Sequence, residues 1–258
     1  MPAPSPRLVL QALDGVPEVL PGTDLAALVL DACAASGWTL QAGDCVALAQ
    51  KIVSKAEGRF VFVDEVRPGA RALELAAVCR KDPRLVELVL SESVDVVRAV
   101  PGVLITEHRL GHVMANAGVD QSNVPAHDGR ERALLLPRDP DASALSLARA
   151  LADRCGVDVS VLINDSFGRP WREGVCGTAI GVYGLPALRD RRGAPDREGR
   201  PMQVTQVALA DEIAAAASAL MGQADEGRPV VAIRGLAFDP SAAGVRAVFR
   251  PRAQDLFR

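Results

Sequence analysis

A hairpin signal constrains the fold of this chain more than any other feature. Two apolar, β-branched segments, Val94–Val100 and Val103–His108, are separated only by the turn pair Pro101-Gly102. Such a pattern predicts two antiparallel strands joined by a tight turn. Helix-like and strand-like segments are interleaved along the rest of the chain. Because a hairpin is foreign to an all-parallel doubly wound sheet, we predict an α+β fold with mixed and antiparallel sheets.

Periodicity and capping signals place the other elements. Thr23 precedes an apolar run as a helix cap, and Asp82-Pro83 combines a capping side chain with proline at the first helical position. The segment 157–163 begins with the period-two alternation of a strand. We predict helices over 24–34, 83–90, 142–154 and 203–221, and strands over 44–49, 157–163 and 229–233.

Composition excludes several classes of protein. The 258 residues can form one unit, 1–258, with two lobes left open, and we expect the Pro-rich segment 1–6 to be disordered. A net charge of −3 gives no electrostatic reason to expect nucleic acid or an anionic membrane as a partner. The five scattered cysteines indicate a reducing compartment. Without a signal peptide or an apolar run of about 18 residues, the sequence predicts a cytoplasmic protein.

The densest candidate site lies in Ile163–Gly174, where we expect the apolar strand to end in Asp165 and Ser166 before a loop rich in glycine and arginine. A carboxylate and a hydroxyl on a rigid support suit magnesium or manganese. Arg169 and Arg172 could bind phosphate or carboxylate groups. An ordinary turn with surface ion pairs is the alternative, and the residues alone do not decide between them.

Three further clusters carry polar side chains after apolar segments. Ala115–Asn123 surrounds the carboxylate of Asp120, and is either a polar turn or a ligand loop that supplies a second carboxylate to a metal site. Gln50–Arg59 follows a predicted strand and contains Lys51 and Lys55, either as phosphate ligands or as a solvated basic turn. Gly222–Gly227 is typical of a helix stop followed by an acidic turn.

The remaining charged segment and most of the histidine and tryptophan residues are interpreted as structural. The charged segment Arg189–Arg200 is interpreted as a solvated loop or hairpin tip rather than a phosphate-binding patch. His108 alternates with apolar neighbours in a strand and is expected to be structural, whereas His112 lies near the second cluster and could approach a substrate. Trp38 and Trp171 are expected to pack against the protein interior.

Taken together, the clusters occur in an order that resembles the coenzyme F420-0:L-glutamate ligases, the gamma-glutamyl ligases of F420 biosynthesis. The resemblance extends from about residue 7 to residue 236. Some actinobacterial relatives carry a fused C-terminal flavin-type domain, which we do not expect in this chain. The matching stretches are Leu13–Glu18, Ala49–Arg59, Ala115–Asn123, Asp165–Arg172, Ala179–Gly181 and Gly222–Gly227.

The resemblance implies a two-lobed fold, a homodimer with β structure at its interface, and a set of ligand-binding positions. One metal ion would be held by Asp120 and Asp165, and a second by Ser166 and Gln223; a monovalent cation such as potassium is also allowed. Ser166 keeps the hydroxyl of a threonine common in the family, whereas Gln50-Lys51 replaces a Ser-Thr pair of some archaeal members. The implied GTP contacts are Asp14, Gly15, Val16, Pro17, Gln50, Lys51, Lys55, Asn123, Met221, Gly222, Gln223, Ala224, Asp225, Glu226, Gly227 and Arg228.

The reaction that the resemblance implies is a GTP-dependent addition of L-glutamate to the terminal carboxylate of F420-0 through an acyl phosphate, with further gamma-linked glutamates left open. We hypothesise that Arg169 and Arg172 orient phosphate or the anionic substrates. Two alternatives remain at this point. A metal-dependent phosphohydrolase or phosphotransferase would use the same carboxylates without an amino-acid acceptor, and a regulatory module would bind GTP without turnover.

Overall fold

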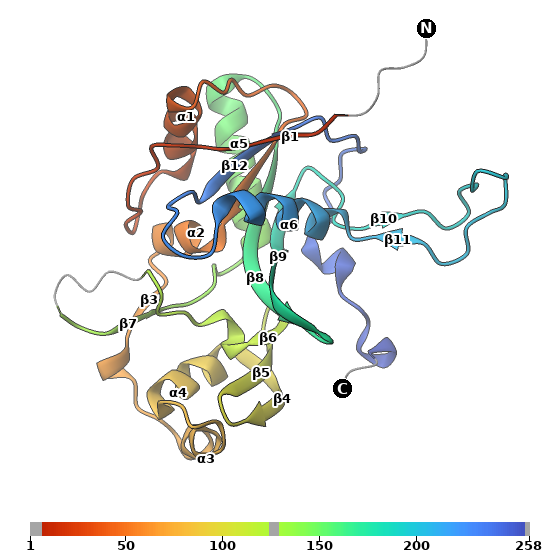
Figure 1. The fold of residues 1–258 in the computed structure, drawn as a ribbon. Coiled ribbons are helices and arrows are strands. Elements are labelled where there is room, and N and C mark those ends of the chain that lie inside the picture. Colours follow the sequence, from red (N-terminus) through yellow and green to blue (C-terminus); the bar gives the residue numbers. More distant parts are fainter. Residues whose placement is uncertain (1–6, 124–128, 256–258) are drawn as a thin grey trace, which may run out of the picture.

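A five-stranded sheet forms the centre of the computed structural model, which describes residues 7–123 and 129–255 (Figure 1). Segment 1–6, which we expect to be disordered, lies outside these described residues. The strand order is β1-β12-β2-β8-β9, and the only parallel pair in this sheet is β2 with β8. The bounds are β1 Val9–Ala12, β12 Val230–Arg234, β2 Cys45–Ala49, β8 Ser160–Arg169 and β9 Arg172–Tyr183. A mixed sheet with antiparallel pairs confirms the predicted α+β class.

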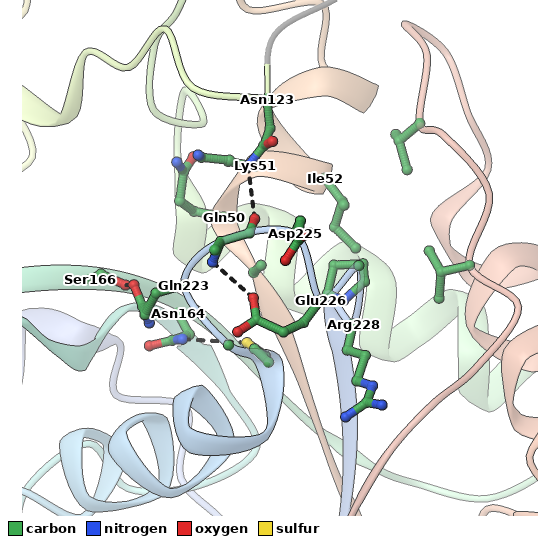
Figure 2. Close-up of a pocket in the computed structure, with 18 of the residues that line it drawn as sticks. Gln50, Lys51, Ile52, Asn123, Asn164, Ser166, Gln223, Asp225, Glu226 and Arg228 are labelled. Carbon is green, nitrogen blue, oxygen red and sulfur yellow. Dashed lines mark hydrogen bonds between the residues drawn. The ribbon is translucent and has the colours of Figure 1, made fainter.

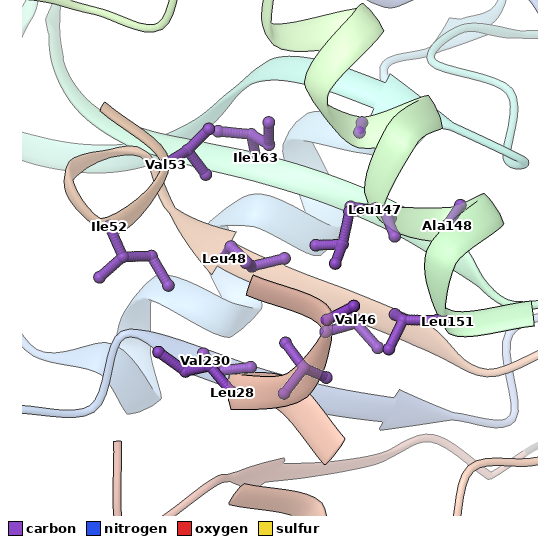
Figure 3. Close-up of a cluster of buried hydrophobic side chains, with 14 of the residues drawn as sticks. Leu28, Val46, Leu48, Ile52, Val53, Leu147, Ala148, Leu151, Ile163 and Val230 are labelled. Carbon is purple, nitrogen blue, oxygen red and sulfur yellow. The ribbon is translucent and has the colours of Figure 1, made fainter. Parts of the chain in front are cut away.

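Helices cover both faces of this sheet because its central strands are apolar on both sides. Alternate residues of a strand point to opposite faces. Val46 and Leu48 of β2 therefore pack with α1 (Leu25–Ala35) and α5 (Pro140–Cys155), as Figure 3 shows for this core. Cys45 and Ala47, which alternate with these two residues along β2, pack instead with α6 (Leu209–Met221) on the other face. Both cores are built mainly from aliphatic side chains, as the low aromatic content of the chain leads one to expect.

A second, three-stranded antiparallel sheet contains the hairpin that the sequence predicts. Its order is β4-β5-β6, with bounds Ser93–Val100, Val103–His108 and Val113–Ala115. Helices α3 (Ala70–Cys79) and α4 (Pro83–Ser91) pack on it around a separate apolar cluster. These elements gather at one end of the molecule (Figure 1). The single unit over 1–258, the two-lobed shape and the dimer interface stay predictions.

Smaller elements connect these parts. β3 pairs with β7, and β10 pairs with β11 at the base of an arm that projects from the body (Figure 1). The charged segment Arg189–Arg200 lies on this arm and is largely exposed, so the predicted solvated hairpin is confirmed. The bounds are α2 Gln50–Ala56, β3 Phe60–Phe62, η1 Val63–Glu65, η2 Asn116–Gly118, β7 Arg132–Leu134, β10 Arg189–Asp190, β11 Gln206–Val207, η3 Val245–Val248 and η4 Arg252–Gln254.

Two predicted helix starts were wrong. Asp24, not Thr23, caps α1: its carboxylate accepts from the backbone N–H groups of Ala26 and Ala27, while Thr23 Oγ1 accepts from Leu20. The last helix begins at Leu209 rather than near 203, because residues 206–207 pair as β11 to close the arm. The Asp82 cap and the Pro83 start are confirmed, with Asp82 accepting from Arg84 N.

Candidate functional site

A cleft of about 650 Å³ opens where β2 ends and α2 begins. Its walls come from segments far apart in the sequence: the loop before α1, the start of α2, the middle of β8 and the loop after α6 (Figure 2). The lining includes Val16, Pro17, Gln50, Lys51, Lys55, Asn123, Asp165, Ser166 and all residues from Met221 to Arg228. The fold therefore brings three of the four sequence clusters into one cavity, with the fourth represented by Asn123.

Helix α2 places the cationic side chains of the cleft. The chain passes from β2 into α2 between Ala49 and Gln50, so the solvated basic turn considered from the sequence was wrong. Ile52 and Val53 anchor the helix in the main core. Lys51 and Lys55 are one turn apart and line the same cavity. Burial lowers the pKa of Lys55, with the nearby charge of Glu18 opposing this and that of Lys51 adding to it.

Asp120 lies beside the cleft and is connected to it through an ion pair with Lys51. The Nζ atom of Lys51 lies 2.7 Å from Asp120 Oδ2 and donates to Ser122 Oγ at 2.6 Å. Asp120 also accepts from the backbone N–H of Ser122 at 2.7 Å, which forms a compact turn around the carboxylate. Burial would raise the pKa of Asp120, but Lys51 and Ser122 outweigh it, so the pKa is lowered. Asp120 is therefore held as a carboxylate.

Asp165 and Ser166 lie inside β8, so the expectation that the strand ends at these two residues was wrong. The strand continues to Arg169 because β9 pairs with it along its whole length. The register shifts between Ile163 and Asn164, a β-bulge of the kind common beside active sites. Alternation then directs Ser166 toward α6 and Asp165 toward the opposite face. Burial, reinforced by the charge of Asp120, raises the pKa of Asp165 to about 6.

The loop after α6 closes the other side of the cleft. Ser166 Oγ donates to Gln223 Oε1 at 2.7 Å, and Gln223 Nε2 donates to Ser218 Oγ at 2.9 Å. The backbone N–H of Ala224 donates to Glu226 Oε2 at 2.8 Å. Asn123 Nδ2 approaches Ala224 O at 3.4 Å, which places the end of the Asp120 turn beside this loop (Figure 2).

The oxygen atoms gathered here fit divalent cations in their chemistry. Two carboxylates, Asp120 and Asp165, lie close enough for the charge of one to raise the pKa of the other. Ser166 and Gln223 add neutral oxygen donors beside them. Hard cations such as magnesium and manganese prefer such oxygen ligands. Within residues 7–123 and 129–255, no group of three or more His, Cys, Asp or Glu side chains gathers as a metal site.

Comparison with known proteins decides the family. The sequence model described as F420-0:Gamma-glutamyl ligase matches residues 15–235. The chain belongs to the F420-0:gamma-glutamyl ligase family. Three relatives are each named Coenzyme F420:L-glutamate ligase. That of Methanothermobacter thermautotrophicus is 46% identical over 96% of this chain and 98% of its own length. That of Methanopyrus kandleri is 45% identical over 98% of both chains, and that of Halobacterium salinarum is 43% identical over 88% and 87%. The chain is thus an enzyme, a ligase.

Five predicted residues of this ligase lie outside the cleft lining, among them Asp120, which contacts the cleft through Lys51. Asp14 and Gly15 precede the lining segment, and the backbone N–H of Asp14 donates to Ser36 Oγ. Arg169 and Arg172 pair with each other across the end of the β8–β9 hairpin, where Arg169 donates to Gly174 O. The expectation that Trp171 packs inward was wrong, since it is 88% exposed at the hairpin turn, whereas Trp38 is buried as expected.

Three polar residues in or beside the cleft were not predicted as site residues from the sequence. Ser122 connects Lys51 with Asp120, and an Asp-x-Ser turn was the available signal. Ser218 binds Gln223 from the last turn of α6. Asn164 is buried in the cleft wall and donates to Met221 Sδ at 3.5 Å, while its Oδ1 atom has no partner among the described residues. A polar residue inside an apolar strand could have identified Asn164.

The side chains of His108 and His112 are both buried. His108 Nδ1 accepts from the backbone N–H of Leu110, which confirms its structural role. His112 is not part of the cleft lining. Its ring packs edge-on against Phe167 and Phe249, so it joins the β8–β9 hairpin to the C-terminal segment.

No helix in the described part of the ligase has the length and apolarity needed to span a membrane.

Proposed function

We propose that this ligase adds L-glutamate to the terminal carboxylate of F420-0 with GTP as the co-substrate. The observation that supports this most is the cleft of a chain that belongs to the F420-0:gamma-glutamyl ligase family. Asp165, two lysines and a serine–glutamine pair converge in it, and Asp120 pairs with one of these lysines at its edge. The names of the relatives give F420 and L-glutamate as what those enzymes join. The fold then supplies a cavity large enough for a nucleotide.

In this proposal, GTP lies along the loop Met221–Arg228 and over α2, with Lys51, Lys55 and Asn123 near its phosphates. Lysine ammonium groups suit phosphate as compact point charges. Asp120 with Asp165 would hold one divalent cation, and Ser166 with Gln223 a second, and these ions would offset charge on the phosphates during transfer. Either magnesium or manganese suits these donors, with a monovalent cation such as potassium as a further proposal.

The reaction has two chemical steps. The carboxylate oxygen of F420-0 attacks the γ-phosphorus of GTP, the bond to the β-phosphate oxygen breaks, and GDP leaves with an acyl phosphate formed. The amine of glutamate then attacks the acyl carbon, loses a proton and displaces phosphate, which leaves an amide. Arg169 and Arg172 would orient an anionic substrate only if that substrate extends along the hairpin beyond the cleft.

Mass spectrometry tests the proposal directly. The protein is incubated with GTP, manganese, L-glutamate and F420-0, and we expect products heavier by one glutamyl unit or several, with GDP and phosphate released. Asp165→Asn should abolish most of this activity, and a wild-type rate in that variant would refute the metal assignment. GTP hydrolysis that needs neither glutamate nor F420-0 would favour the phosphohydrolase alternative. The homodimer that the family resemblance implies and the cytoplasmic location that the sequence predicts remain proposals.

A further inference from the structure

The ammonium group of Lys51 is held by the turn at Asp120 and Ser122, beside the cleft. An ammonium group has three N–H donors and no acceptor. In this structure Nζ of Lys51 meets Asp120 Oδ2 at 2.7 Å, Ser122 Oγ at 2.6 Å and Ser122 O at 3.2 Å. Three acceptors therefore match three donors. The lysine can bind a phosphate only by exchanging at least one of these contacts.

The carboxylate of Asp120 is also engaged, through both of its oxygen atoms. Oδ1 accepts from the backbone N–H of Ser122, and Oδ2 accepts from Ser122 Oγ at 3.0 Å as well as from Lys51. A divalent cation that coordinates Oδ2 would meet the ammonium group at the same oxygen atom. Two positive charges at that distance repel each other strongly, even where solvent screens them. The side chains of Lys51 and Asp120 are 27% and 32% exposed, so screening is incomplete.

A lysine side chain can resolve this competition by moving. Its stem is flexible, and Lys51 projects from the first turn of α2 into a cavity that continues along the loop 221–229. Nucleotide phosphates in that cavity would offer the ammonium group new acceptors. Lys55, one turn further along α2, lines the same cavity without an ion pair to Asp120.

We infer that the ammonium group of Lys51 pairs with the Asp120 carboxylate until a nucleotide binds. The nucleotide phosphates then bind Lys51 instead, and the Asp120 carboxylate becomes available to coordinate the divalent cation. This inference rests on the proposed GTP and metal site. Lys51 is then a positioning residue with two alternating anionic partners. On this inference, a divalent cation binds weakly to the nucleotide-free enzyme and binds tightly only when the nucleotide is also bound.

Manganese binding without nucleotide tests the inference. Free Mn²⁺ is measured by electron paramagnetic resonance while the full-length protein is titrated. Lys51→Met should lower the Mn²⁺ Kd by about tenfold or more, because a repelling charge at the ligand oxygen is gone. Lys51→Arg keeps the charge and should stay near wild type. Lys55→Met removes a charge from the same helix without a contact to Asp120, and its shift should be less than about threefold.

Nucleotide binding should move in the opposite direction. In excess Mn²⁺, Lys51→Met should weaken binding of a non-hydrolysable GTP analogue, because the phosphates lose a lysine partner. A merely structural role for Lys51 would weaken both ligands, and thermal unfolding of each variant checks that it is folded. Equal or weaker Mn²⁺ binding by Lys51→Met, with wild type binding Mn²⁺, overturns the inference and leaves the metal site standing. Failure of all proteins to bind Mn²⁺, with and without the nucleotide analogue, overturns the metal site as well.

Discussion

The hydroxyl of Ser166 donates a 2.7 Å hydrogen bond to Oε1 of Gln223, and this bond connects the middle of β8 to the loop that follows α6. Gln223 is fixed from its other side by Ser218, in the last turn of the same helix. The two oxygen atoms are thus held on one wall of the cleft by elements packed in the core. An arrangement of this kind limits how far either side chain moves when a ligand binds.

Replacement of Ser166 tests the importance of that hydroxyl. Ser166→Ala removes a proposed metal ligand and also the hydrogen bond that supports Gln223, so we expect ligase activity to fall by at least the roughly 10- to 100-fold that is typical of lost support around a metal ligand. Ser166→Thr keeps the hydroxyl and should retain activity within about threefold of wild type. Steady-state rates at saturating GTP, measured for both variants, check this. Equal activity in the alanine and threonine variants would contradict a role for the hydroxyl.

Glu92 is expected to be important for stability rather than chemistry. Its carboxylate is buried, lies 2.9 Å from Arg59 and 3.2 Å from Arg109, and so joins the chain after α2 to the turn after β5. Glu92→Ala would leave two arginines without their shared partner. We expect a loss of about 3–5 kcal/mol in the free energy of unfolding, the usual cost of breaking a buried ion pair. Chemical denaturation measures it, and a loss below about 1 kcal/mol would contradict the burial argument.

The acid stability of the protein should reflect Glu92 as well. Burial would raise the pKa of Glu92, but His108, Arg59 and Arg109 bring it to about 2, below its ordinary value of 4.5. A depressed carboxyl pKa contributes stability that is complete above the unfolded value and is lost as the pH falls. Unfolding free energies measured between pH 5 and pH 2 should therefore decrease steeply, and the decrease should be smaller in Glu92→Ala.

The burial of His112 leads us to expect a second pH dependence of the free energy of unfolding, at higher pH than that of Glu92. Burial, helped by His108 and Arg246, lowers the pKa of His112 from 6.5 to about 4, against a hydrogen bond to the backbone of Ile180. Between these two values the unfolded chain binds the proton and the folded chain does not. Stability is therefore lost as the pH falls from 6.5 to 4, by roughly 3 kcal/mol in total. His112→Leu should show a flatter profile over that window, and an unchanged slope would contradict the assignment.

Local signals in the sequence predicted several of the helices and strands, whereas the geometry of the cleft needed the tertiary fold. Hairpin β4–β5 and the start of α4 followed from turn and capping residues that act within a few positions. The Lys51–Asp120 pair joins residues 69 positions apart, which no local pattern encodes. Likewise, β8 runs through Asp165 because β9 pairs with it, although the sequence there, rich in glycine and polar residues, favours a loop.

Gly177 explains how the bond between Ser166 and Gln223 becomes geometrically possible. It is the cross-strand partner of Ser166, and a side chain there would collide with the backbone carbonyl of Ala214 and with Ser218 in α6. The absence of a side chain lets α6 approach β9 closely.

Gly177→Ala should therefore displace α6 and cost about 1–3 kcal/mol in the free energy of unfolding, with weaker nucleotide binding because Gln223 moves with the helix. Gly168 is the matched control, since it lies on the same hairpin with open space around it. Gly168→Ala should change stability by less than about 0.5 kcal/mol. Denaturation of both variants tests the pair. If Gly177→Ala were as stable as Gly168→Ala, α6 could not depend on this close approach.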